Sequence, residues 1–130
     1  MAWEQPGFKV TMIAHADLSA AQYHFVQLVA DNEVDLCVNL TDKVFGILQN
    51  APTALGQPAE VMLMGVSKLR VGAGGAIGVG DSVGTDAASE GVTKADGVNV
   101  THYVPAICLE GAAAGAIASV FINSVPNRAA

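Results

Sequence analysis

A glycine-rich run, "LRVGAGGAIGVGDSVGTDA" (69–87), contains the residues of this chain that most resemble a phosphate-binding loop. A dinucleotide-binding fingerprint requires G-x-G-x-x-G, and counting from Gly78 the third glycine position falls on Val83. A P-loop requires Gly-Lys-Ser/Thr, whereas Gly80 is followed by Asp81, whose carboxylate would repel phosphate. We therefore predict that the run forms turns between strands, that Asp81 bonds turn amides, and that no cofactor binds there.

The other residues that could carry chemistry do not form a recognisable site. No histidine has a partner at metal-ligand spacing, no serine lies in a G-x-S-x-G elbow, and the aspartates fall near expected turns and strand ends. We predict that the chain is not an enzyme, with no catalytic residue and no metal ligand. The residues considered are His15, His24, His102, Ser19, Ser67, Ser82, Asp17, Asp31, Asp35 and Asp42.

Composition limits the possible partners. The formal net charge is −6, the pI is about 4.7, and the six Lys and Arg residues are scattered. A nucleic-acid-binding surface needs clustered basic residues, so we expect no nucleic-acid partner. A hydrophobic fraction of 52% and a mean hydropathy of +0.42 predict faces covered by other subunits, although an Ala-rich surface without a partner stays open. Cys37 and Cys108 lie in apolar runs without a CxxC motif and are expected to be buried, reduced thiols.

One segment, Tyr103–Ile122, is long and apolar enough to span a bilayer. Pro105 and Gly111 interrupt it, Glu110 would lie near the membrane centre, and no Lys or Arg cluster flanks it. We expect two strands around a turn of small residues, and no membrane partner. The N-terminus also lacks the pattern of a signal peptide.

The secondary structure is predicted to be all-β, in a small barrel or sandwich of short strands. Runs of β-branched and aromatic residues alternate with turn residues, and no window predicts a helix longer than about two turns. Asp17–Gln22 is predicted to form one helical turn at most, and Asp31-Asn32 to form the tight turn of a hairpin. The predicted strands are Phe8–Ala14, Tyr23–Val29, Val34–Leu40, Val44–Gln49, Glu60–Val71, Val98–Tyr103, Pro105–Glu110 and Ile117–Ile122, with a further short strand on either side of the Gly80-Asp81 turn.

Two segments share a residue pattern. "VFGILQNAPTALGQPAEVML" (44–63) and "VPAICLEGAAAGAIASVFI" (104–122) both place Val, then Ile, then a loop of small residues containing Gly56 or Gly115, then Ala-x-Val. The shared pattern predicts two similar hairpins in one barrel.

The first sixteen residues differ in character from the rest. They hold the only Trp, Trp3, beside a Pro6-Gly7 pair that breaks regular structure. A Trp side chain in an irregular segment is costly to leave in water, so Trp3 either packs on its own barrel or docks on a neighbour. We predict docking, with Trp3 and Phe8 as apolar anchors. This divides the chain into an N-terminal arm (1–16) and a barrel-like domain (17–130).

An ordered series of motifs resembles the capsid cement (head decoration) proteins of tailed bacteriophages. The series is "DLSAAQYHFVQLV", "GILQNAP" followed by "AEV", "GVSK", "GDSV" and the closing "LEGAAAG" with its final strand. It covers nearly the whole chain from Asp17. The family's closing loop usually has an acidic residue after its glycine, where this chain has Ala116 and Ile117.

The resemblance implies a β-barrel protein on the outer surface of an icosahedral head, made in the host cytoplasm. It implies a symmetric oligomer, commonly a homotrimer, that stabilises the lattice by bridging neighbouring major capsid protein subunits. One alternative is a small β-barrel module that binds a ligand or glycan, which needs a pocket with converging polar groups. A remote alternative is a membrane-active phage protein in which 103–122 is helical.

Overall fold

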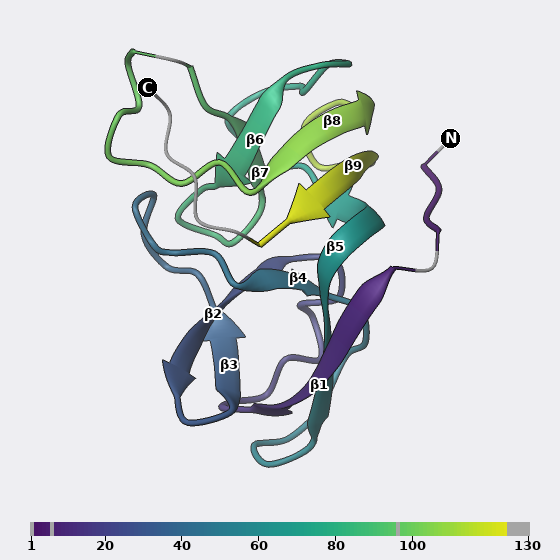
Figure 1. Ribbon diagram of the computed structural model, residues 1–130, viewed down its shortest axis with the longest axis vertical. Helices are drawn as coiled ribbons and strands as arrows, with labels where there is room; N and C mark the ends of the chain where they lie inside the picture. Colours follow the sequence, from purple (N-terminus) through teal and green to yellow (C-terminus); the bar gives the residue numbers. More distant parts are fainter. Residues whose placement is uncertain (1, 6, 96, 125–130) are drawn as a thin grey trace.

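The computed structural model describes residues 2–5, 7–95 and 97–124, and all of its regular structure is β (Figure 1). The predicted all-β class is confirmed, since no helix occurs anywhere in these ranges. The strands are β1 (Phe8–Ala14), β2 (Phe25–Ala30), β3 (Glu33–Leu36), β4 (Gly46–Leu48), β5 (Pro58–Arg70), β6 (Ser82–Thr85), β7 (Gly91–Thr93), β8 (Ala106–Glu110) and β9 (Ile117–Asn123).

The first five strands close into a mixed barrel, called the first barrel below. Its strand order is β1-β3-β2-β4-β5, and β5 pairs back with β1 to complete the ring. The β1–β3 pairing is parallel and covers only Ile13 and Ala14, whereas the other pairings are antiparallel. The predicted turn at Asp31-Asn32 joins β2 to β3, so this hairpin is confirmed.

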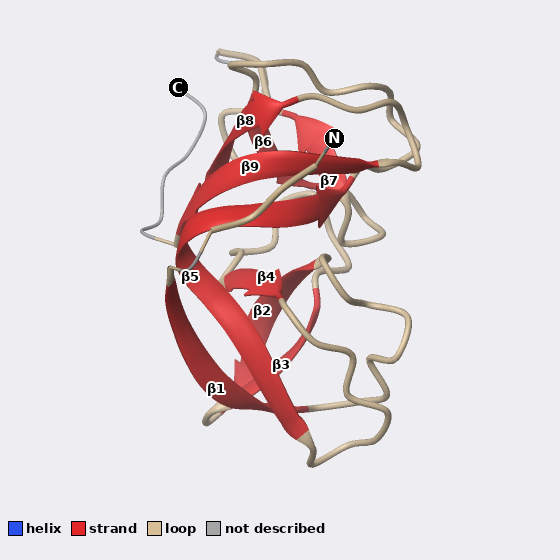
Figure 2. Cartoon of the chain, turned by 90° about the vertical axis from the view of Figure 1, so that its right-hand side faces the viewer, coloured by secondary structure: helices blue, strands red, loops and turns tan. Residues whose placement is uncertain are grey.

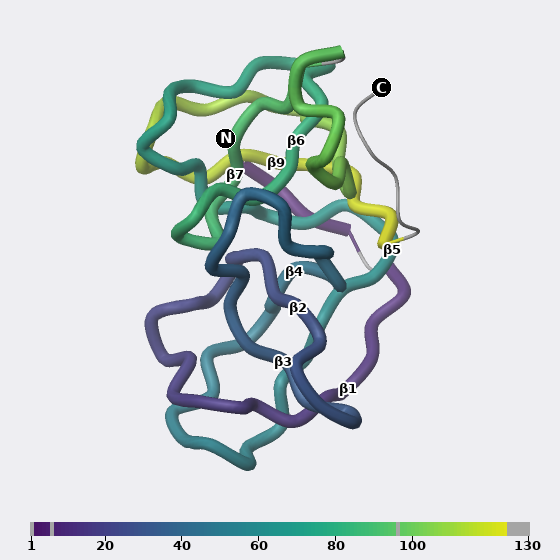
Figure 3. Tube along the Cα trace, turned by 90° about the vertical axis from the view of Figure 1, so that its left-hand side faces the viewer, coloured from purple at the N-terminus to yellow at the C-terminus, as the bar shows by residue number. Residues whose placement is uncertain are grey.

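The other four strands and the second half of β5 repeat the arrangement of the first barrel. Strand β9 pairs with β5 as β5 pairs with β1, and the order β9-β8-β6-β7 matches β5-β4-β2-β3. The parallel pair Ala14↔Val34 has its counterpart in the isolated parallel bridge Val71↔Gly91, which joins the residue directly after β5 to the start of β7. We call this unit the second barrel. Figure 3 shows it above the first, with β5 running through both.

The backbone repeats in detail. Ala14 and Val71 each donate to a loop carbonyl, of Gln57 (2.9 Å) and Ala116 (2.8 Å), and so hold equivalent hairpins β4–β5 and β8–β9. The two similar hairpins that the sequence predicts are therefore confirmed, although β8–β9 belongs to the second barrel. Residues with positive φ also recur in matched pairs: Asn32 (61°) and Ser89 (62°), Tyr23 (66°) and Gly80 (83°), and Gly56 (90°) and Gly115 (80°).

Strands β2, β4 and β5 form a wall with a core on each side. Alternate residues of a strand point to opposite faces, so neighbours along these strands enter different cores. The core inside the first barrel takes Val26, Leu48 and Val61, and the core that extends into the second takes Phe25, Ile47 and Met62. This explains why β5 has apolar residues at consecutive positions.

Two predictions of strands were wrong, and one strand was missed. Val98–Tyr103 is mainly a turn, because the Asn99 side chain accepts from Ala95 N (2.7 Å) and its carbonyl accepts from His102 N (2.8 Å). Before the Gly80-Asp81 turn, Ile77 forms a single bridge with Ala112 and no strand. Strand β7 was not predicted.

The expected boundary of the arm at residue 16 also needs correction. Strand β1 pairs with β3 and β5 and closes the first barrel, so Phe8–Ala14 belongs to the barrel. The arm proper, within the part of the chain that is described, is residues 2–5, followed by Gly7. The predicted helical turn at Asp17–Gln22 is a non-helical turn in which Asp17 Oδ1 accepts from Ser19 N (2.9 Å).

The apolar segment Tyr103–Ile122 contains the hairpin β8–β9, as expected, and not the helix that the membrane-active alternative requires. Among the described residues, no helix has the length and apolar character needed to cross a bilayer.

Gly65 offers a test of how the arm and β5 fit together. It has φ +137°, and a Cβ there would lie 2.9 Å from Gly7 Cα. Gly75 has φ +127° but no neighbour within 4 Å of a Cβ, so it is a matched control for backbone strain alone. We expect both Ala substitutions to destabilise by about 1 kcal/mol or more from strain, and Gly65→Ala to cost clearly more than Gly75→Ala in urea denaturation. Equal losses would show that the approach to Gly7 is unimportant.

Candidate functional site

An apolar surface lies on the outer side of β5, β9 and β8. Val66 pairs with Phe121, which pairs with Ile107, so these three side chains stand in a row on one face. Phe121, Ile107 and the nearby Leu109 are all exposed. We call Val66, Ile107, Leu109 and Phe121 the apolar face.

The N-terminal arm runs along β9 and β5 (Figure 2), the strands that carry Phe121 and Val66 of the apolar face. Ser119, two residues before Phe121 in β9, has a fully buried side chain whose Oγ accepts from Trp3 N and donates to Trp3 O (2.9 Å). Further along, Gln5 N donates to Val66 O (3.1 Å). The arm backbone is thus held by its own barrel, while the Trp3 residue stays 39% exposed.

Phe8, the other predicted anchor, opens β1 and is 63% exposed. It pairs with Met64, which is also exposed and pairs in turn with Asn123 of β9. Trp3 and Phe8 therefore lie at separate places, Trp3 at Ser119 and Phe8 at Met64, but both border the same pair of strands.

Sequence reasoning missed Met64, Ile107, Leu109 and Phe121 as surface residues. The signal was present in "AICLE", where apolar residues occupy consecutive positions in a strand. In β8 the residues Ala106 and Cys108 are buried while Ile107 and Leu109 are exposed. A strand with apolar side chains on both faces has either two cores or one core and one binding surface, and the sequence does not distinguish these cases.

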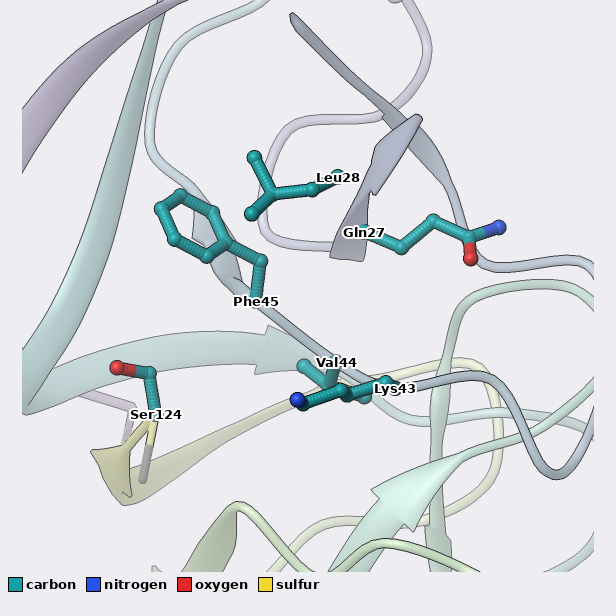
Figure 4. A pocket seen from close by; sticks show the side chains of 6 residues that line it. All are labelled: Gln27, Leu28, Lys43, Val44, Phe45 and Ser124. Carbon is teal, nitrogen blue, oxygen red and sulfur yellow. The ribbon is translucent and has the colours of Figure 1, made fainter. Parts of the chain in front are cut away.

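A cavity of about 310 Å³ lies at the mouth of the first barrel (Figure 4). Leu28, Val44 and Phe45 form its apolar wall, with Lys43 and Ser124 at the rim. Figure 4 shows the Gln27 amide pointing away from Leu28 and Phe45. Its Nε2 already donates to Leu36 O and Asp42 Oδ2, both at 3.1 Å. The polar groups that line the cavity therefore do not converge on it, as the ligand- or glycan-binding alternative requires.

The glycine-rich run forms turns in which carboxylates accept from particular amides. Gly78 N donates to Asp81 Oδ2 (2.8 Å), as predicted for this turn. Asp86 Oδ1 accepts from the amides of Ala88 (2.8 Å) and Glu90 (2.9 Å). Asp81 and Asp86 therefore compete with a phosphate for these amide donors.

We accordingly expect no saturable binding of ATP or NAD at 69–87. Isothermal titration calorimetry at millimolar nucleotide should give only heats of dilution. Saturable binding that is lost in Gly78→Ala or Gly80→Ala would contradict this account of the run.

The most unusual polar group is Lys94, which is 3% exposed. Its Nζ lies 2.8 Å from His102 Nδ1 and 3.4 Å from Leu40 O. Burial lowers the pKa of Lys94, and burial together with the Lys94 ammonium lowers the pKa of His102.

Within the described ranges, no three His, Cys, Asp or Glu residues stand together in a way that could hold a metal ion. Cys37 and Cys108 are free and buried, as expected, and burial raises the pKa of Cys37 to about 12.

The Lys94–His102 pair predicts a pH dependence of stability. Because the pKa of His102 is lower in the folded state, the unfolded chain takes up this proton first as the pH falls below 6.5, and stability decreases through that window. We expect the melting temperature to drop between about pH 7.5 and about pH 5.5, and to drop less in His102→Gln, which cannot become charged. An equal drop in both proteins would show that this pair does not contribute.

The double barrel, with an exposed apolar face and a Trp-bearing arm, defines a β-structured protein suited to binding other proteins. The family model described as "Phage cement protein" matches residues 4–122, so the chain belongs to the phage cement protein family. This family is structural and non-enzymatic, which makes the chain a capsid-associated, virion structural protein and confirms that it is not an enzyme.

A solved structure shares the fold. The "head fiber gp8.5 N base in bacteriophage phi29" aligns with a TM-score of 0.57 over 93% of this chain and 98% of that chain, at 16% identity. No curated protein sequence matches the chain significantly.

Proposed function

We propose that this protein binds the outer surface of a phage head and stabilises the capsid by bridging neighbouring major capsid protein subunits. The observation that carries the proposal is the family match over residues 4–122, which covers both barrels and part of the arm. The shared fold with the phi29 head fibre base, at 93% coverage, supports attachment to a phage head.

The surface suits this role. Trp3, Phe8 and the apolar face place three aromatic residues in exposed positions along β5 and β9. Aromatic anchors carry much of the binding energy of protein interfaces, commonly about 2 kcal/mol or more each. The net charge of −6 does not suit the packaged nucleic acid and is compatible with a place outside the shell.

A homotrimer strengthens weak contacts through avidity. Each protomer repeats the same contact around a symmetry axis, and the rigid lattice makes the second and third contacts effectively intramolecular. Contacts with several capsid subunits then oppose their separation under the pressure of the packaged genome.

The arm provides the sharpest test. Trp3→Ala keeps the backbone bonds to Ser119 and removes the ring of a residue that is 39% exposed, so the far-UV spectrum of the free protein should not change and its melting should change little. Loss of an anchor worth about 2 kcal/mol should weaken attachment to heads lacking the protein by at least about tenfold, measured by co-sedimentation. Deleting residues 1–5 should weaken it at least as much.

Leu55→Ala is the matched control. Leu55 is 69% exposed in the β4–β5 loop, away from the arm, and its truncation should leave decoration of heads unchanged. If Trp3→Ala decorates heads as well as the unaltered protein, the arm is not an anchor. If it fails to fold, Trp3 belongs to the barrel's own structure.

A further inference from the structure

The two barrels differ at one equivalent place, the outer edge of their first strand. The first strand of the first barrel is β1, and the first strand of the second barrel is the latter half of β5. Their registers match, since Val10↔Val61 corresponds to Ser67↔Val120 and Met12↔Ala59 to Leu69↔Ala118. Each barrel therefore serves as a control for the other.

Hydrogen-bond directions identify the edge of β1. Ala14 N donates to Gln57 O (2.9 Å), so the backbone N–H and C=O groups of the even-numbered residues of β1 point toward β5. Ile13 N donates to Asn32 O on the opposite side of the strand (2.9 Å). The backbone N–H and C=O groups of Lys9 and Thr11 point to the same side as those of Ile13. Pairing with β3 ends at Ile13, and among the described residues no backbone partner is seen for Lys9 or Thr11.

The equivalent edge in the second barrel is covered at its start. Gln5 of the arm donates to Val66 O, at the position that corresponds to Lys9 (3.1 Å). The two edges agree further along, since Arg70 N donates to Tyr23 O (3.0 Å) as its counterpart Ile13 donates to Asn32 O. The Tyr23 ring also lies under the Lys68 ammonium, 5.7 Å from its centroid. The chain itself thus supplies the cover for this edge.

Burial of the inward-facing side chains reflects the difference. Ser67 and Leu69, beneath the covered edge, have no exposed surface. Their counterparts Val10 and Met12 pack on the core of the first barrel but are only half-buried. An extended segment beside β1 would cover the edge of the first barrel at Lys9, as the arm covers that of the second at Val66.

We propose that the edge of β1 at Lys9 and Thr11 binds an extended segment of a capsid subunit by β-strand addition. The inference rests on the proposed function. Apolar side chains at alternate positions of the segment cover Val10 and Met12, and an acidic residue lies opposite the exposed Lys9. The arm of a second copy is not the occupant, because each copy's arm is engaged at its own Val66 and Ser119.

The test replaces Thr11, whose amide faces the open edge. Thr11→Pro removes that donor and blocks strand addition, yet breaks no hydrogen bond that is seen among the described residues, and proline is tolerated on edge strands. Thr11→Val keeps the amide and the strand preference and is the control. We expect Thr11→Pro to bind heads lacking the protein at least about tenfold more weakly, and Thr11→Val to bind them normally.

Hydrogen exchange on the unaltered protein gives a second measurement that does not depend on how the proline variant folds. On heads, the Thr11 amide should exchange at least about tenfold more slowly than in the free protein, while the Val10 amide, already bonded to β5, changes little. Unchanged exchange at Thr11 on heads overturns the inference, as does normal binding by a folded Thr11→Pro.

Two results would assign the edge to another occupant and also overturn the inference. Protection of Thr11 in the free protein that rises with concentration would indicate a second copy. Protection in the free protein that disappears when residues 125–130 are deleted would indicate the chain's own end. If the unaltered protein does not bind heads at all, the proposed function fails first.

Discussion

Strand β5 is the element on which both barrels depend. Its thirteen residues form the last strand of the first barrel and the first strand of the second. Within it, Val61 enters one core and Met62 the other, so the strand is packed from both sides. Small domains bury a limited share of their surface, and a shared wall lets two small barrels stabilise each other. The β1–β5 register shifts between Met62 and Met64, at the junction of the two halves, and Gly7 packs against the adjacent Gly65.

The repeat also makes the differences between the halves informative. The arm covers the outer edge of the second barrel at Val66, whereas the first barrel has an open edge at the corresponding Lys9, half-buried core residues and a cavity at its mouth. Unpaired edges are usually blocked in soluble proteins because they pair with other chains. In a phage cement protein, an open edge, an exposed aromatic arm and an apolar face all suit attachment to a protein lattice.

Much of the fold could be predicted from the sequence, because β-branched runs and turn residues report local structure. The hairpins β4–β5 and β8–β9 were predictable from their shared pattern, and so were the β2–β3 hairpin and the turn at Asp81. The full repeat was not, since most matched positions, such as Tyr23 and Gly80, keep the backbone conformation and not the residue type. The surface at Ile107 and Phe121 was missed because alternation cannot tell a second core from a binding face, and the docking of Trp3 and Phe8 stays a prediction.

The central claim is that this double barrel holds capsid subunits together from outside the head. A cryo-electron microscopy reconstruction of heads decorated with the protein tests it most directly. We expect density for both barrels on the outer surface around three-fold or quasi-three-fold positions, with the arm and β1 turned toward the shell and touching more than one capsid subunit. Density confined to the inside of the head, or a protein that touches a single subunit with its arm and β1 facing solvent, would contradict the account.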